Sequence, residues 1–183
     1  KDMRRRFTVG LLGLCLAAGM LLTGCQTNAG YKSDVKKAIC VIQPTTGNQT
    51  KGWVSFTQVS GGILVVAEVE GLSPGSHGFH IHQFGDCSSG DGKSAGGHFN
   101  PHGKAHGGPD KLVRHVGDLG NLEADEAGKA SYYRVDNRLS LEGRSNIIGR
   151  GIIIHAKVDD LNSQPTGAAG ARVGCGVIGV SKK

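Results

Sequence analysis

The chain has 183 residues, which suits one domain once a leader is removed, since single domains cluster near roughly 100 to 150 residues. Its 31 glycines exceed the average usage of about 7% and its aromatic residues are few, which indicates many tight turns and argues against a helical bundle. Residues 1–24 hold four basic residues and one acid, so 17 basic and 14 acidic residues remain, a net charge of +3. This charge is too small for a nucleic-acid surface, so we expect no nucleic-acid partner.

Residues 1–24 have the features of a secretion signal. The first six are mostly basic, and 7–22 form an apolar run shorter than the roughly 20 residues that a membrane-spanning helix needs. The run closes in Leu-Thr-Gly-Cys25, which resembles the lipobox of bacterial lipoproteins, where the cysteine carries the lipid. We expect a signal peptide over 1–24, a lipid on Cys25, a tether over 25–35 and export to a bacterial membrane, on the periplasmic side or the cell surface. The alternative is an ordinary cleavage site followed by a buried cysteine.

Eight short runs rich in Val, Ile, Phe and Trp, separated by turn residues, predict the strands of a domain over residues 36–183. In chain order they cover residues 37–42, 52–58, 63–70, 78–83, 121–124, 130–135, 151–157 and 175–180. Strands at this spacing predict an all-β fold, an antiparallel β-sandwich or flattened barrel.

Two segments interrupt the strand pattern. Residues 84–118 are rich in Gly, His and Asp, and residues 159–172 are polar and rich in Gly. Long loops inside a compact domain are usually functional. We therefore expect these two loops to carry the site.

All eight histidines lie between residues 77 and 155. His80 and His82 fall in a predicted strand, where residues two apart point to the same face. Candidate metal ligands follow at His98, His106, His115, Asp118 and His155. A tetrahedral zinc takes four ligands of the His and Asp kind, whereas imidazole-rich tetragonal surroundings suit copper(II). Two such sites need eight contacts from seven side chains, so one imidazole must use both ring nitrogens.

The cysteines divide by position. Cys15 and Cys25 belong to the leader and the anchor, and Cys40, Cys87 and Cys175 belong to the folded body. Export permits a disulfide, and an odd count leaves one thiol free or bound to another molecule. The count alone does not choose the pair.

Several segments together closely resemble the copper,zinc superoxide dismutases, over residues 37–180. They are GFHIH (78–82), GGHFNP (96–101), HGGP (106–109), RHVGDLG (114–120), IIGR (147–150) and GCGVIG (174–179). The resemblance implies an eight-stranded Greek-key barrel and an enzyme that converts superoxide to dioxygen and hydrogen peroxide. The alternative is a related metal-binding lipoprotein without turnover, although this chain lacks none of the ligand positions.

The resemblance also implies the roles of the site residues. Copper would be held by His80, His82, His98 and His155, and zinc by His98, His106, His115 and Asp118, with His98 as the bridge and proton carrier. Asp159 matches the carboxylate that accepts hydrogen bonds from His80 and His106. Arg172 matches the catalytic cation that docks the substrate anion, and Thr166 matches the hydroxyl that narrows the channel. His77 matches a structural histidine that bonds to the backbone.

The same resemblance implies a disulfide between Cys87 and Cys175. Cys40 lies between Ile39 and Val41 in the first predicted strand, so we expect it to be a buried free thiol. Residues 84–85, 147–149 and 176–180 are similar to dimer-contact segments of animal and plant members, so we expect a homodimer. Bacterial members can dimerise differently or remain monomeric.

Overall fold

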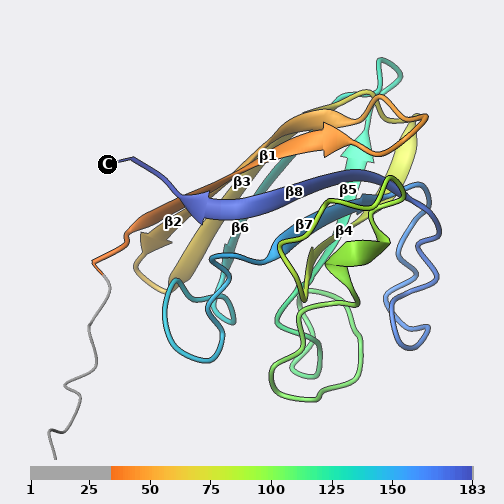
Figure 1. Ribbon diagram of the computed structural model, residues 1–183. Coiled ribbons are helices and arrows are strands. Elements are labelled where there is room, and N and C mark those ends of the chain that lie inside the picture. Colours follow the sequence, from red (N-terminus) through yellow and green to blue (C-terminus); the bar gives the residue numbers. More distant parts are fainter. Residues whose placement is uncertain (1–33, 183) are drawn as a thin grey trace, which may run out of the picture. The chain divides into compact units, whose positions relative to one another are not determined.

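The computed structural model describes residues 34–182, and within them all eight predicted strands are present (Figure 1). They are β1 (Lys37–Pro44), β2 (Lys51–Val59), β3 (Gly62–Glu70), β4 (Gly75–His82), β5 (Asp118–Ala124), β6 (Ala130–Asp136), β7 (Gly151–His155) and β8 (Arg172–Val180). A single 3₁₀ turn, η1 (Lys93–Ala95), lies in the loop between β4 and β5. The predicted signal peptide, Cys25 and most of the tether lie outside the described residues. Within residues 34–182 there is no helix long and apolar enough to cross a membrane.

The strands form one antiparallel sheet in the order β5-β4-β7-β8-β1-β2-β3-β6, which curls into a nearly closed barrel. Strands β3 and β6 are neighbours, as are β4 and β7, so the chain crosses over in the Greek-key manner. The edge strands β5 and β6 meet where the Tyr132 hydroxyl donates a hydrogen bond to the Leu119 carbonyl at 2.9 Å. The predicted fold class is confirmed.

Alternation along the strands builds the core. In β1 the side chains of Ala38, Cys40 and Ile42 point inward, and the residues between them are exposed. In β2, Val54 and Phe56 are buried in the same way. A fully buried aliphatic or aromatic side chain contributes about 1.5 to 3 kcal/mol, so such positions fix the register of the barrel.

Strand β4 departs from alternation, because its last six residues are all buried. Phe79 and Ile81 face the core, while His80 and His82 face the opposite side, which the long loops cover. The strand therefore forms the boundary between the apolar core and a second buried region made of polar side chains.

The strand ends differ from the sequence prediction at three places that matter for the site. Strand β5 begins at Asp118, β7 ends at His155 and β8 begins at Arg172. After His155, the Ala156 and Lys157 amides bond to the carbonyls of Ala171 and Ala169 in the following loop, not to a strand. The loop contacts end the strand earlier than the apolar pattern indicates.

A disulfide joins Cys87 to Cys175, with a Cα–Cα distance of 5.9 Å, and the predicted pairing is confirmed. It links the β4–β5 loop to β8 across 88 residues of sequence. Cys40 is a buried free thiol, as expected. The loop is thereby fixed against the barrel at the point where the polar region is built.

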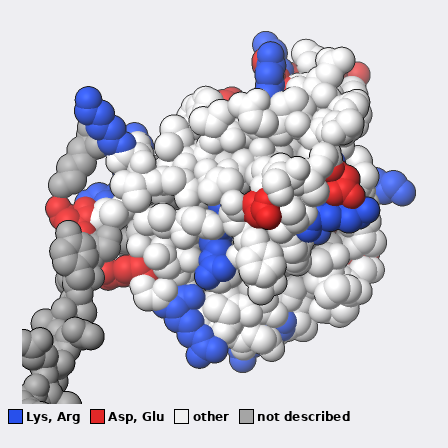
Figure 2. All heavy atoms as spheres, in the orientation of Figure 1, with Lys and Arg blue, Asp and Glu red and all other residues white. Residues whose placement is uncertain are grey.

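The outer face of the barrel over β1 and β8 carries few charged side chains (Figure 2). Val41 is 56% exposed and Val177 is 44% exposed, and Ile39 and Trp53 are also partly open to solvent. Phe84, in the neighbouring loop, is 50% exposed. These residues form an apolar patch that we call the β1–β8 face.

Candidate metal centre

Seven buried side chains form two groups of potential metal ligands. One group is His80, His82, His98 and His155, and the other is His98, His106, His115 and Asp118. Within each group the ligand atoms all lie within 4.8 Å of one another, and His98 belongs to both. The structure thus brings together all seven side chains that the sequence singled out.

The strands and the β4–β5 loop position these side chains. Strands β4 and β7 are antiparallel neighbours, with His80 opposite Ile153 and Phe79 opposite Ile154, so His155 follows directly after the last of these pairs. The His155 ring centroid lies 5.1 Å from that of His80 and 5.6 Å from that of His82. The loop returns alongside β4 and places His98 opposite His82 in an isolated β-bridge. Residues more than 70 positions apart in sequence therefore share one buried region.

In the first group, three rings are oriented by one hydrogen bond each. His80 Nε2 bonds to Asp159 Oδ2 at 2.8 Å, His82 Nδ1 to the Gly96 carbonyl at 2.9 Å and His155 Nδ1 to the Gly170 carbonyl at 3.1 Å. The opposite nitrogens are buried and have no hydrogen-bond partner in the described chain: His80 Nδ1, His82 Nε2, His98 Nε2 and His155 Nε2. Buried polar atoms are normally satisfied, and a ring whose N–H is held on one side presents a lone pair on the other. Four such lone pairs fit a copper ion.

The second group surrounds one oxygen of Asp118. Asp118 Oδ1 lies 2.8 Å from His98 Nδ1 and 3.1 Å from the Nδ1 atoms of both His106 and His115. Ligand atoms about 2.0 Å from a tetrahedral ion lie about 3.3 Å apart, so this spacing fits zinc with little adjustment. Asp118 Oδ2 accepts hydrogen bonds from the amides of His115 and Gly107, which fix the carboxylate.

Asp159 connects the two groups. Its carboxylate accepts hydrogen bonds from His80 Nε2 at 2.8 Å and from His106 Nε2 at 2.9 Å, as the resemblance implies. Burial favours the protonated form, but the hydrogen bonds from these two histidines outweigh it and hold the pKa of Asp159 well below its usual range. The Asn121 side chain bonds to both the amide and the carbonyl of Asp159 and so fixes its backbone.

The pKa of His106 shifts in the opposite direction to the pKa values of the rings in the first group. Burial lowers the pKa of His80 to about 3 and that of His155 to about 4, and burial also lowers the pKa of His82. Burial acts in the same direction on His106, but the carboxylates of Asp118 and Asp159 outweigh it and raise the pKa of His106 to about 9. The rings of the first group are therefore neutral at pH 7, the state that a metal requires.

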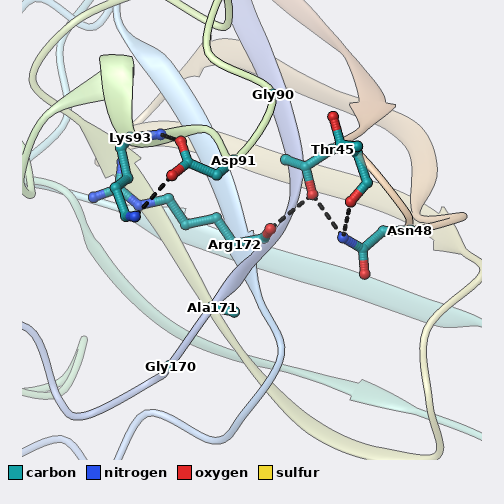
Figure 3. Close-up of a pocket in the computed structure, with 9 residues that line it drawn as sticks. Thr45, Asn48, Gly90, Asp91, Lys93, Gly170, Ala171 and Arg172 are labelled. Carbon is teal, nitrogen blue, oxygen red and sulfur yellow. Dashed lines mark hydrogen bonds and ion pairs between the residues drawn. The ribbon is translucent and has the colours of Figure 1, made fainter.

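Arg172 lies beside the first group, directly opposite His155 in the β7–β8 pairing. Its guanidinium donates to the Gly92 carbonyl at 2.7 Å and to the Gly96 carbonyl at 2.6 Å. Gly96 also accepts the bond from His82, so one carbonyl orients both side chains. Arg172 borders a cavity of about 570 Å³. Lys93 also lines this cavity and is paired with Asp91 at 2.8 Å, and Figure 3 shows these side chains. Arg172 itself has no carboxylate partner within residues 34–182.

Two further histidines and Thr166 lie outside both groups. His77 bonds through its ring nitrogens to the backbone carbonyls of His155 and Ser73, as expected for a structural residue. His102 is exposed in its turn. Thr166 is half-buried, and none of the hydrogen bonds in the described chain involves its side chain, so its channel role stays a prediction.

Sequence reasoning missed two residues that support the second group. The Gln164 side chain makes two hydrogen bonds to the backbone of His106. Its Oε1 accepts from the His106 amide at 2.9 Å, and its Nε2 donates to the His106 carbonyl at 3.0 Å. Gly167 has a φ of +70°, and a side chain there would collide with the Asp159 carboxylate and the His106 ring. The Gly-rich composition of residues 159–172 is a weak sequence signal for the role of Gly167. Nothing in the sequence around Gln164 indicates that it contacts His106.

Comparisons with known proteins agree with this geometry. Residues 50–178 match the copper/zinc superoxide dismutase family. A superoxide dismutase [Cu-Zn] of Paramecium bursaria Chlorella virus 1 is 46% identical over 157 residues, which cover 82% of this chain and 83% of that protein. The crystal structure of the clock protein EA4 superposes with a TM-score of 0.75 at 43% identity, covering 82% of this chain and 98% of that one.

Proposed function

The chain belongs to the copper/zinc superoxide dismutase family, and we propose that its two histidine groups carry out the disproportionation of superoxide to dioxygen and hydrogen peroxide. Its cofactors are copper and zinc. The observation that carries the proposal is the set of buried, unpartnered ring nitrogens in the first group, next to a second group with tetrahedral spacing.

The first group would hold copper and the second zinc. Copper held in the first group would supply one-electron redox chemistry, by which one superoxide would be oxidised to dioxygen and a second would be reduced and leave, with two protons, as hydrogen peroxide. The protein's own part is to hold the donor atoms in place, attract the anion and deliver protons. Asp159 and the carbonyls of Gly96 and Gly170 hold the donor atoms in place, because their hydrogen bonds fix the orientations of the histidine rings.

His98 is the residue that joins the two groups. Its Nδ1 faces Asp118 and the zinc ligands, while its Nε2 faces the copper ligands without a partner in the described chain. Nε2 can therefore hold a proton when it is not bound to metal and pass it to the departing product. The zinc group keeps the ring in place during this exchange.

Arg172 is the group that would receive the substrate. Its guanidinium is fixed by two carbonyls and keeps N–H donors that the described chain does not use. Lys93 is the other cation that lines the cavity beside Arg172, and Asp91 compensates its charge. We assign anion docking beside copper to Arg172 and a channel-lining role to Thr166.

Metal analysis with a superoxide assay tests this function. The reconstituted protein should contain one copper and one zinc per chain and should remove superoxide only when copper is present. A single metal site would contradict the assignment of the two groups. Two bound metals without turnover would instead identify a metal-binding relative of the enzymes.

We also propose that Cys25 carries a lipid and holds the enzyme at a bacterial membrane, on the basis of the basic head, the apolar run and the lipobox pattern. Intact mass spectrometry of detergent-extracted protein from the native host should show the acyl modification. A Cys25→Ser variant should lose it and appear in the soluble fraction. An unmodified Cys25 in the host would refute the proposal.

A homodimer is the third proposal. The β1–β8 face is apolar, partly exposed and poor in charge, and it includes Phe84 and Val177 from two of the expected contact segments. Ile147 of the remaining segment is fully buried in the core, so it cannot contribute its side chain. The occupant we assign to this face is a second copy of the chain.

A further inference from the structure

A second polar cavity lies outside the metal centre, between the turn at residues 101–104 and the segment 137–145 that follows β6. Its volume is about 460 Å³, within the range of small-molecule sites. The side chains that line it include His102, Lys104, Arg114, Arg138 and Arg144. No carboxylate lines it. Figure 2 shows Lys and Arg side chains at the lower edge of the molecule, where these loops lie.

Of the four Lys and Arg side chains that line the cavity, three have no carboxylate partner in the described chain that compensates their charge. Arg114 is buried and paired with Asp136, so its charge is neutralised. Lys104, Arg138 and Arg144 are exposed and make no ion pair with any residue in the range 34–182. Like charges that share a cavity without counter-charges repel one another, and an anion placed among them relieves that repulsion.

Hydrogen bonds hold the cavity open and orient its arginines. Arg144 Nε donates to the Pro101 carbonyl at 3.0 Å, and His102 Nε2 lies 3.1 Å from Ser145 Oγ, so the two segments are tied together. Arg138 Nη2 donates to the Leu112 carbonyl at 2.8 Å. The guanidinium groups of Arg138 and Arg144 are thus each oriented by one hydrogen bond. Their remaining terminal N–H donors have no acceptor in the described chain.

We propose that this cavity is a binding site for a phosphate-type oxyanion, either a free phosphate compound or the phosphate headgroup of a lipid. Guanidinium forks match the oxygens of such groups with two parallel hydrogen bonds, and prior orientation reduces the entropy lost on binding. The site is separate from the substrate path, because it shares no lining residue with the cavity beside Arg172.

Titration of the copper- and zinc-loaded protein with inorganic pyrophosphate, followed by calorimetry and by amide shifts in NMR, tests the site. We expect one bound pyrophosphate per chain, shifts centred on residues 101–104 and 137–145, and weaker binding at higher salt. The Arg138→Gln/Arg144→Gln variant should bind at least about tenfold more weakly, since charge-assisted hydrogen bonds are the strong ones.

A charge-matched control removes two cations elsewhere. Lys37→Gln/Lys129→Gln should keep the wild-type affinity, because both lysines are exposed and neither lines the cavity. Both double variants should keep their metals and their dismutase activity, so failure here leaves the proposed function untouched. Equal weakening in the two double variants, or no saturable binding, would overturn the proposal.

A second arm distinguishes the two sources of the phosphate. Flotation with vesicles of phosphatidylglycerol, compared with phosphatidylcholine, measures headgroup binding by the chain without its lipid. A lipid headgroup would be the ligand if the protein binds the anionic vesicles, if pyrophosphate competes with this binding and if the Arg138→Gln/Arg144→Gln variant loses it. Pyrophosphate binding without vesicle binding would assign a free phosphate compound.

Discussion

Each histidine of the first group has one ring nitrogen bonded inside the protein and one that faces the metal position. The bonded side determines which nitrogen carries the proton, and therefore which one can donate to a metal. Nothing in the described chain bonds to the inward nitrogens of His80, His82 and His155. Loss of one such ring should affect copper far more than zinc.

We expect His155→Ala to lose copper and at least about a hundredfold of activity, since even outer-shell changes cost 10- to 100-fold. Zinc content should stay near one per chain, because His155 belongs only to the first group. Elemental analysis of the purified variant measures both metals. Full activity in this variant would contradict the copper assignment.

Arg172 should act through its charge. A unit charge about 4 Å away contributes about 1 kcal/mol even in water, so Arg172→Ala should slow turnover about fivefold and Arg172→Glu about thirtyfold. Stopped-flow superoxide decay at several salt concentrations measures this. Added salt should slow the wild type but not the Glu variant, because salt screens attraction and repulsion alike.

Both Arg172 variants should retain their metals. If both match the wild type at every salt concentration when fully metallated, then Arg172 is only a surface residue.

Cys40 should be unreactive in the native state. Burial raises the pKa of its thiol to about 12, and only the thiolate is nucleophilic. The Cys40 thiol has a pKa of 9.0 in the unfolded chain and about 12 in the folded chain. Between these two pH values the unfolded chain loses the proton more readily than the folded chain does, so the contribution of Cys40 to the free energy of unfolding falls as pH rises from 9.0 to about 12. Peptide mapping after iodoacetamide treatment at pH 8 should find Cys40 unlabelled in native protein and labelled in denaturant. Labelling of native protein at that pH would show that the thiol is not buried.

At the scale of elements, the β4–β5 loop and the β7–β8 loop have no regular ladder and depend on specific contacts. The disulfide fixes one end of the first loop to β8, and Gln164 of the second loop holds His106 of the first. Because His106 belongs to the second group of potential metal ligands and also bonds to Asp159, this contact joins the loops at the candidate metal centre.

We expect Gln164→Ala to release zinc about tenfold faster, within the range for supporting contacts around metal sites. Competition with a chromogenic chelator measures the rate, and copper content should be unchanged. Asn162→Ala is the matched control, since the Asn162 side chain bonds only within its own loop. Equal zinc release from the two variants would show that Gln164 does not position His106.

At the scale of the whole molecule, the β1–β8 face is the part of the described surface that a second copy would cover. Stable interfaces bury about 800 Å² per partner around apolar anchors. Phe84 and Val177 are suited to such anchoring because they are large or branched, apolar and about half exposed.

Phe84→Glu should weaken a dimer by about thirtyfold or more, the usual effect of losing a central anchor. Sedimentation velocity over a range of protein concentrations measures the dissociation constant. Tyr133→Glu is the control, because Tyr133 is 75% exposed but lies on β6, away from this face. A wild type that stays monomeric at every concentration would reject the dimer.

The sequence by itself determined the eight strands, since period-two alternation and turn residues act locally along the chain. It also supplied the seven ligand-type residues, because their number and their resemblance to known motifs do not depend on knowing the fold. The Cys87–Cys175 pairing followed from the same resemblance and is confirmed.

Only the tertiary structure decided which nitrogen of each ring is free, because the partners are carbonyls and carboxylates brought near by loop folding. The carbonyls of Gly96 and Gly170 are examples, and neither has a periodic signal. Gln164 reaches His106 across 58 residues, and Arg144 reaches Pro101 across 43. Such contacts depend on where two irregular loops meet in space, which the packing of the whole barrel fixes and no local pattern encodes.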